Sequence, residues 1–449
     1  MNRLFKSKYY PIIPQFFTLI AFIFLIFGSI GITHENSELI MQLRNTNLAN
    51  LIVWSYWWPI IIIVAVLFGR HWCSICPVEL ITSLFSMLGI KKKPSNFLKS
   101  KWLITLFYLL IIILAIHTFS IHRIPQRMSF YLIGLFILSI LIGFIYEKRT
   151  FCTYICPVGN LLGLYALLSR YGLRIRNQET CDSCKTKDCI AKQNHYKLIG
   201  RSCTSELYPK SIQDNRQCIL CTQCVKACPN NNIEYRKLGP IRKQLANLNL
   251  LNAELALLII LTGFIVYEVY AVWGPIKKQL LYIPDYVNNY LSVSKPITGI
   301  VKALLLFVIY PSIIFVLFGF ISKTQQHKNR TNRLKILAIA FLPIIAWMHF
   351  AKALFKTSSR IPYLEWVNTD YLGLANAQNI IDRTLILSQH PHLKLGITLL
   401  CSILLGYALI ISFKTTRLII SDKKINVVIG VLCIAYACVY FYPFIMHFI

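Results

Sequence analysis

The chain has 449 residues, of which 56% are hydrophobic and 14% are charged, and its mean hydropathy is +0.57. Charged residues make up about a quarter of an ordinary soluble domain, so this composition excludes a soluble globular fold and indicates a polytopic membrane protein. The net charge of +30 would suggest nucleic acid as a partner of a soluble chain, but basic loops on one side explain it in a membrane protein, and no nucleic-acid partner is expected.

Apolar runs of spanning length predict about nine transmembrane helices. They lie at 11–33, 50–69, 102–118, 128–146, 250–273, 298–321, 336–354, 394–413 and 426–446. A cytoplasmic amino terminus would place five connecting segments on the same side, namely 1–10, 70–101, 147–249, 322–335 and 414–425. These segments hold 35 of the 47 basic residues, a bias that favours this orientation. The lipid bilayer is therefore the first expected partner.

The first half of the chain contains an internal repeat. GRHWCSICPVEL, residues 69–80, follows the second apolar run, and KRTFCTYICPVGN, residues 148–160, follows the fourth. Each copy has a basic edge, a cysteine pair and a proline before a leucine-rich stretch. Pro77 and Pro157 suit the first turn of a helix, where a backbone N–H is not needed. Both copies are therefore predicted to continue as helices that lie along the cytoplasmic interface and end in basic clusters.

The four cysteines of this repeat, Cys73, Cys76, Cys152 and Cys156, are candidate ligands or redox groups. They precede helix starts, where the helix dipole and free N–H groups favour thiolate, and a reducing compartment keeps thiols free. If the two copies lie side by side, the sulfurs could form one site for copper, zinc or iron–sulfur. They could also cycle between dithiol and disulfide, or simply pack at the membrane edge. The repetition favours a redox or metal site, which would be a third such centre, and leaves the metal open.

The segment CILCTQCVKACP carries the most specific motif of the chain. Cys218, Cys221, Cys224 and Cys228 follow the C-x2-C-x2-C-x3-C-P spacing of bacterial ferredoxins. Three of these thiolates bind one [4Fe–4S] cluster, and the fourth binds a second cluster. Zinc ligands usually come as separated pairs, so the run indicates iron–sulfur.

A second set of cysteines completes a two-cluster arrangement. CDSCKTKDC and RSCTSELYP supply the additional ligands. The ferredoxin rule assigns cluster one to Cys181, Cys184, Cys189 and Cys228, and cluster two to Cys218, Cys221, Cys224 and Cys203. Four residues separate Cys184 from Cys189, and Cys203 lies 14 positions after Cys189, so both spacings depart from the usual one.

No catalytic residue is assigned from the sequence. His349 and His117 lie in or near apolar runs and could bind haem, but no repeated histidine spacing supports this, and His349 is interpreted as a core or interfacial residue. A metal role for His390 and His392 is weaker still. The remaining cysteines are interpreted as small buried residues that pack between helices; they are Cys401, Cys433 and Cys438.

The expected fold is an all-α polytopic membrane protein with an inserted cytoplasmic, ferredoxin-like α+β module that holds two clusters. The predicted domains are an N-terminal membrane domain at 1–173, the module at 174–249 and a C-terminal membrane domain at 250–449. The module has little apolar material for a core, so bound clusters should stabilise it. In the last domain, the non-cytoplasmic segment 355–393 could form short helices or a docking surface.

Residues 50–235 resemble the NosR/NapH/FixG-type membrane iron–sulfur proteins. The resemblance rests on GRHWCSICP, FCTYICP and CILCTQCVKACP, although the first motif is one residue shorter than CxxxCP. It implies a bacterial inner-membrane protein that exchanges electrons with a redox partner and that could use quinone. It covers none of the chain after residue 249.

Two functional hypotheses follow from these motifs. The first is membrane-bound electron transfer through two cytoplasmic [4Fe–4S] clusters that link the quinone pool or a cytoplasmic donor to a partner redox enzyme, in the manner of a quinol dehydrogenase component. The second is a metal-handling assembly factor that delivers or reduces copper for a respiratory oxidase or reductase. A transporter is less favoured, because few ionisable residues lie at mid-depth in the apolar runs.

Overall fold

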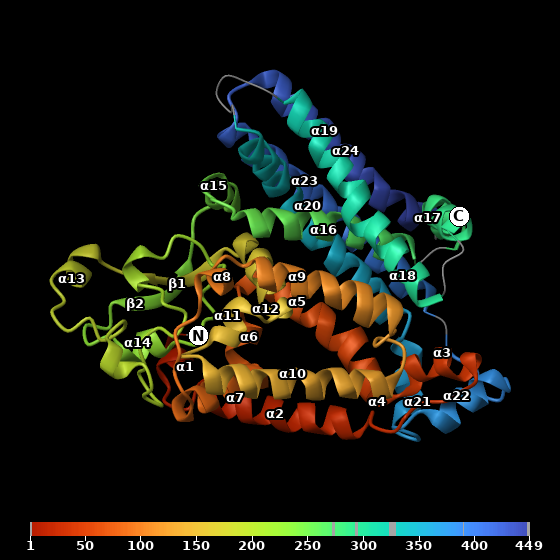
Figure 1. Cartoon of the computed structure of the whole chain (residues 1–449), viewed down its shortest axis with the longest axis horizontal. Helices are drawn as coiled ribbons and strands as arrows, with labels where there is room; N and C mark the ends of the chain where they lie inside the picture. The colour runs from red at the N-terminus through yellow and green to blue at the C-terminus, as the bar shows by residue number, and fades with distance from the viewer. Residues whose placement is uncertain (1, 272–273, 292–294, 323–328, 389, 447–449) are drawn as a thin grey trace. The chain divides into compact units, whose positions relative to one another are not determined.

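The computed structural model describes residues 2–271, 274–291, 295–322, 329–388 and 390–446. The chain is mostly helical, with one two-stranded sheet (Figure 1). It forms two compact units that each combine segments distant in sequence. Unit 1 comprises 1–31, 60–104 and 128–244, and unit 2 comprises 32–59, 105–127 and 245–449. The three sequence domains stay a prediction.

Seven helices within the described residues are long and apolar enough to cross a membrane. They are Leu48–Phe68, Pro125–Ile145, Asn252–Tyr270, Ile297–Ile321, Arg330–Val367, Pro391–Ile419 and Lys423–Tyr442. Each coincides with one of the nine predicted spans. The other two predictions, at 11–33 and 102–118, correspond to the shorter apolar helices Ile12–Phe27 and Trp102–Ile116. The chain is thus compatible with a multi-pass membrane protein, and the count of nine stays a prediction.

Unit 1 contains the repeat and the cysteine-rich module. Its helices and strands, some of which extend past the unit boundaries, are α1 (Asn2–Lys6), α2 (Ile12–Phe27), α5 (Trp58–Phe68), α6 (His71–Ile75), α7 (Pro77–Leu88), α8 (Asn96–Lys99), α9 (Trp102–Leu110), α10 (Pro125–Ile145), α11 (Thr150–Tyr154), α12 (Pro157–Tyr165), β1 (Tyr171–Ile175), α13 (Gln178–Asp182), α14 (Gln223–Ala227), β2 (Ile233–Lys237) and α15 (Ile241–Ala246).

The two copies of the repeat fold alike. In each, a long helix (α5 or α10) is followed by a one-turn helix (α6 or α11) that carries the first cysteine. The second cysteine, Cys76 or Cys156, is the N-cap of the next helix, which begins at Pro77 or Pro157 as predicted. The N-cap backbone is extended in both, so the proline ring fits the first turn without losing a helical hydrogen bond.

Strands β1 and β2 close the ends of the module. They pair antiparallel, with Tyr171 opposite Lys237 and Ile175 opposite Ile233, and the eight module cysteines lie between them in sequence. The prediction that the second copy ends as an interfacial helix is wrong at this point, because helix ends before Ser169 and residues 171–175 form β1. Leu173 is buried in a core with residues of β2, which favours a strand here.

The core of the module is small and partly built from the amino terminus. Phe5 and Tyr10 pack with Leu173, Ile233 and Tyr235, and four of the module cysteines pack against this core. The Phe5 ring meets the Tyr235 ring edge-on at a centroid distance of 5.4 Å. The short α1 segment therefore contributes apolar surface that the module itself lacks.

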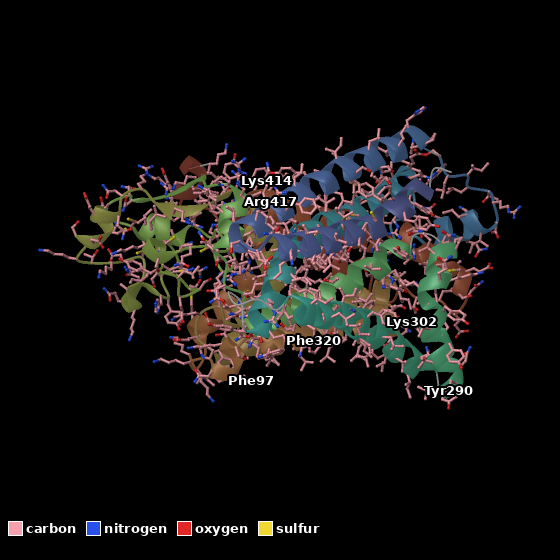
Figure 2. All side chains as sticks on the ribbon, turned by 90° about the horizontal axis from the view of Figure 1, so that it is seen from above. Phe97, Tyr290, Lys302, Phe320, Lys414 and Arg417 are labelled. Carbon is pink, nitrogen blue, oxygen red and sulfur yellow. The ribbon has the colours of Figure 1, made fainter. Side chains whose placement is uncertain are left out.

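Unit 2 is an assembly of long helices around α20. Its elements are α3 (Ser37–Thr46), α4 (Leu48–Leu51), π-helical turns Ile52–Trp57, Ile111–Thr118 and Leu305–Ile309, α16 (Asn252–Tyr270), α17 (Gly274–Leu291), α18 (Lys295–Leu304), α19 (Tyr310–Ile321), α20 (Arg330–Ser358), 3-10 turn Ile361–Tyr363, α21 (Leu364–Val367), α22 (Leu374–Ile381), α23 (Pro391–Ile419) and α24 (Lys423–Met446). Helix α20 packs against α16 and α23 and is buried on nearly every side, whereas Phe320 of α19 and Tyr290 of α17 point outward (Figure 2).

The segment 355–393 forms short helices, as one of its two sequence interpretations expected. Helices α21 and α22 lie within it, and Ala377 of α22 packs on Leu39 and Leu43 of α3. Thr46 also donates a hydrogen bond of 2.7 Å to the carbonyl of Gly373. Helix α3, which lies between the first two predicted spans, and the segment that contains α22 therefore pack against each other within unit 2.

Candidate functional site

The four membrane-edge cysteines come together in unit 1. Cys76 lies within electrostatic range of Cys73, Cys152 and Cys156. The two copies of the repeat are thus adjacent, as a shared site requires. We call these four residues the membrane-edge quartet; their role as ligands stays a prediction.

Cations and backbone N–H groups surround the membrane-edge quartet. The Arg70 guanidinium donates to Cys73 Sγ at 3.4 Å, and the Gly159 N–H donates to Cys156 Sγ at 3.3 Å. A Cβ at Gly159 would lie 3.0 Å from the Arg70 guanidinium, so glycine permits this close approach. Arg70 Nε is buried and has no hydrogen-bond partner among the described residues. These donors fit a negatively charged sulfur-ligated centre.

The thiols of the quartet are more deeply buried than their helix-start positions suggested. Burial raises the pKa of Cys76 and Cys152, and it raises that of Cys156 to about 12. The expectation that the helix starts would favour free thiolates is wrong for these three cysteines, because desolvation outweighs the N–H groups. A bound metal or cluster would supply the positive charge that deprotonates them.

The cluster-one cysteines line a single cavity. Cys181, Cys184, Cys189 and Cys228 all line one small, partly open hollow in the module. Asn232 donates from its side chain to Cys181 Sγ at 3.1 Å and from its backbone to Cys228 Sγ at 3.3 Å. The structure therefore brings the predicted set together despite the unusual spacing before Cys189, and supplies N–H donors of the kind that tune iron–sulfur clusters.

The cluster-two cysteines also gather. Cys224 lies within electrostatic range of Cys203, Cys218 and Cys221. The backbone N–H of Leu220 points at Cys218, and two N–H groups after Cys203 point at its sulfur. The long loop between Cys189 and Cys203 thus places Cys203 near the other three cysteines of its predicted set.

Left-handed backbone conformations shape the cysteine loops. Leu220 and Thr222, inside the CILCTQC loop, both have φ of 59°. This conformation costs a non-glycine residue about 1–3 kcal/mol, and alternation between right- and left-handed residues turns successive N–H groups toward an anion. Similar residues follow the other cysteines; they are Lys187, Glu206 and Asn231. The loops are therefore built to surround a negative group.

One backbone hydrogen bond and one buried arginine connect the three cysteine sets. The Cys203 N–H donates to the Cys189 carbonyl at 2.9 Å, which ties cluster two to cluster one. The Arg149 guanidinium lies within electrostatic range of Cys152 and Cys73 at the membrane edge and of Cys221 in cluster two. Arg149 is only 1% exposed, so it is a buried positive charge between two candidate cofactor sites.

A buried carboxylate holds this arrangement, and the sequence analysis missed it. Glu79 Oε1 lies 3.0 Å from Arg149 Nε and 2.9 Å from an Arg201 terminal nitrogen, and its carboxylate accepts hydrogen bonds from Ser83 and Gln15. Burial alone would raise the pKa of Glu79, but Arg201 and Arg149 lower it on balance. The sequence feature that could have indicated Glu79 as a site residue is its position, two residues after Cys76-Pro77 in an otherwise leucine-rich helix.

The other candidates separate into buried and exposed residues. His349 is buried in unit 2, and its Nε2 accepts a hydrogen bond of 3.1 Å from Trp58 Nε1, which is the arrangement of a core histidine. The side chain of His117 lies outside the described residues. Within the described part, no three His, Cys, Asp or Glu side chains are grouped to hold a single metal ion. Cys401 and Cys433 are buried as predicted, but that prediction is wrong for Cys438, which is exposed.

The comparisons with known proteins point to iron–sulfur chemistry. A family described as a 4Fe-4S binding domain (Fer4_5) matches residues 50–96 and 128–176. These are the two copies of the repeat, so the match falls on the membrane-edge quartet. It supports an iron–sulfur protein and does not favour the copper-handling alternative.

Two curated relatives resemble part of the chain. An uncharacterized protein of Methanocaldococcus jannaschii, MJ0749, is 24% identical over 184 residues, which are 39% of this chain and 68% of that protein. The putative electron transport protein YccM of Escherichia coli is 26% identical over 195 residues, or 37% of this chain and 51% of that protein. No solved structure matches the chain significantly.

Proposed function

We propose that this chain is a membrane-bound electron-transfer protein that links the quinone pool or a cytoplasmic donor to a partner redox enzyme. Three observations support it: the iron–sulfur family match on the repeat, the similarity to a protein named as a putative electron transport protein, and the apolar helices. Bound clusters would supply one-electron carriers. The bacterial inner membrane, with the module and amino terminus on the cytoplasmic side, is part of this proposal.

The observation that carries the proposal is the match of a 4Fe-4S binding domain family to both copies of the repeat, and the closeness of the cysteines within each candidate set supports it. Cluster one would be held by Cys181, Cys184, Cys189 and Cys228, and cluster two by Cys203, Cys218, Cys221 and Cys224. The membrane-edge quartet would hold a third iron–sulfur centre, because the matched family is described by that cofactor. The backbone hydrogen bond from Cys203 to Cys189, and the position of Arg149 within electrostatic range of both Cys221 and Cys152, support an order from cluster one through cluster two to the membrane edge.

Iron analysis and EPR of the anaerobically purified full chain test this assignment. Three [4Fe–4S] clusters correspond to about 12 irons per chain and two to about eight. Cys73→Ser should remove about four irons and one EPR signal if the quartet holds a cluster. Cys401→Ser is the matched control, since this buried cysteine lies outside all three sets, and it should retain all iron. Fewer than about six irons in the unmodified chain would refute the two-cluster module.

The link to quinone needs a separate measurement. Anaerobic addition of a quinol should bleach the visible absorbance of the oxidised clusters, and Cys152→Ser should slow or abolish this reduction while dithionite still reduces the module. If quinol reduces the variant as fast as the unmodified chain, the quartet is not on the route. If quinol reduces neither protein and dithionite reduces both, the chain receives electrons from another donor.

A further inference from the structure

Five basic side chains meet at one end of unit 2. Lys356 lies within electrostatic range of Arg44, Arg123, Lys352 and Arg360. Arg44 comes from α3, Arg123 from the turn before α10, and the other residues from the carboxyl end of α20 and the turn after it. We call these five residues the cation cluster.

The cation cluster has little negative charge to balance it. Within the described residues, Lys352 pairs with Glu268, and no carboxylate within ion-pair distance is found for the other four. Arg360 donates to Ser55 Oγ at 3.0 Å, and the Lys356 ammonium lies 5.7 Å from the centre of the Trp54 ring. Neutral partners of this kind do not cancel charge. Arg360 is 4% exposed, so solvent does not cancel it either.

This concentration runs against the charge bias of the chain. Only 12 of the 47 basic residues lie outside the predicted cytoplasmic segments, and five of these 12 form the cation cluster. Topology disfavours cations on that side, and burying like charges together costs free energy. A ligand that pairs with them would offset this cost.

The cluster is lined by hydrogen-bond donors that have no partner. Trp54 Nε1, Tyr56 Oη and His122 Nδ1 are buried and make no hydrogen bond within the described part of the chain. The Trp54 and His122 rings are 6.2 Å apart, and Arg360 is within electrostatic range of Tyr56. An indole N–H cannot accept a hydrogen bond, so the ligand must present acceptors.

The tautomer of His122 adds one more donor. Arg123 Nε donates to His122 Nε2 at 3.3 Å, which leaves the ring proton on Nδ1. Burial lowers the pKa of His122 well below its usual value, and the nearby Lys356 and Arg123 lower it further, so the ring is neutral at pH 7. The His122 Nδ1–H, like the Trp54 N–H, is therefore a buried donor without a partner among the described residues.

One acceptor among these donors narrows the ligand class. Asn50 donates through Nδ2 to the carbonyls of Arg44 and His122, at 3.2 and 3.4 Å, and its buried Oδ1 has no partner among the described residues. A ligand that is anionic but carries a hydroxyl would satisfy Asn50 and the donors together. Hydrogen phosphate has this property, and so does a phospholipid whose phosphate bears glycerol.

We propose that the cation cluster, with Trp54, Tyr56 and His122, binds a phosphate group, which comes either from an anionic phospholipid headgroup or from free inorganic phosphate. Arg360 and Lys356 supply the charge, and the aromatic donors orient the oxygens. The site uses none of the twelve clustered cysteines, and the proposal does not depend on the proposed electron-transfer function.

Ligand-induced stabilisation of the full chain tests the proposal, because a ligand that binds only the folded state raises Tm. The delipidated chain in neutral detergent is titrated with sodium phosphate against sodium chloride at equal ionic strength. In parallel, nanodiscs of phosphatidylcholine are compared with nanodiscs that contain phosphatidylglycerol, and retained phospholipid is counted by native mass spectrometry. A Tm increase with inorganic phosphate identifies a free-anion site; an increase only with phosphatidylglycerol, with one retained molecule, identifies a lipid headgroup.

Charge-matched variants make the test specific. Lys356→Gln and Arg360→Gln should each weaken the stabilising ligand by about tenfold or more, since each removes a charge-assisted hydrogen bond. Lys278→Gln, an exposed lysine of α17 outside the cation cluster, should change the affinity less than about twofold. If either variant fails to fold, Trp54→Phe keeps an aromatic side chain but loses the indole N–H together with part of the ring system, and it should also weaken binding. The proposal is overturned if neither phosphate source raises Tm, or if Lys278→Gln weakens binding as much as Lys356→Gln.

Discussion

Glu79→Gln is the substitution that most directly tests the organisation of unit 1. Glu79 is 1% exposed and lies 3.0 Å from Arg149 and 2.9 Å from Arg201. Glutamine keeps the size of the side chain and some of its hydrogen bonds but removes the charge, which leaves two buried guanidiniums without their carboxylate. Breaking one buried ion pair costs about 3–5 kcal/mol. We therefore expect the free energy of unfolding to fall by at least about 3 kcal/mol.

The assay is anaerobic denaturant unfolding of the full chain in detergent, followed by tryptophan fluorescence and by the visible absorbance of bound clusters. Glu234→Gln is the matched control, because Glu234 pairs at 2.8 Å with Arg176, whose side chain is 51% exposed, and such an exposed pair should contribute no more than about 1 kcal/mol. The double variant Glu79→Gln with Arg201→Gln should recover part of the loss. A loss for Glu79→Gln no larger than that of the control would refute the role given to this network.

Four further results are expected. The two arginine partners of Glu79 lower its pKa in the folded chain, so the stabilising contribution of the Glu79 carboxylate is present above the ordinary pKa of 4.5 and is lost as pH falls through the lower folded value. Below about pH 4.5 the unmodified chain should therefore lose more unfolding free energy than Glu79→Gln does. Arg149→Gln should lower the reduction potentials of the neighbouring centres by tens of millivolts in an EPR titration, whereas Arg149→Lys should keep most of the potential. Gly263→Ala should destabilise unit 2 by about 1–3 kcal/mol in thermal unfolding, since its Cβ would collide with the Leu306 carbonyl, whereas Gly406→Ala, which meets open space, should be neutral or stabilise by up to about 1 kcal/mol. Removing iron with a chelator should lower the Tm of the module, and a Tm that does not change would show that the clusters do not stabilise it.

Features set by local sequence were predictable. The proline at each N1 position fixed the helix starts after Cys76 and Cys156, and seven apolar runs became helices of spanning length. The ferredoxin spacing grouped the module cysteines into two sets, and this assignment stays a prediction: Cys189 lies within electrostatic range of the other members of its set, but Cys224 lies within range of Cys189 as well as of its own set. Each of these results depends on a short motif or on a run of one residue type.

Features that depend on distant partners were not predictable. Tyr171–Ile175 became a strand because it pairs with β2. This partner lies more than 50 residues away in sequence, and the local pattern instead suggested the end of a helix. Glu79, Arg149 and Arg201 are each unremarkable in sequence, and only the fold shows that they form one buried network. The thiol pKa values likewise depend on burial, which a motif at a helix start does not reveal.

The buried charges of unit 1 support a cofactor at the membrane edge. Three arginines of unit 1 are less than 8% exposed, namely Arg70, Arg149 and Arg201. The buried carboxylate of Glu79 pairs with Arg149 and with Arg201. Nε atoms of Arg70 and Arg201 are buried without a hydrogen-bond partner among the described residues. An excess of buried cations destabilises a protein unless anions lie nearby, and neutral thiols cannot supply the charge. Four thiolates around an iron–sulfur core carry net negative charge. The arginines that destabilise the cofactor-free chain would therefore stabilise the chain once a cluster is bound.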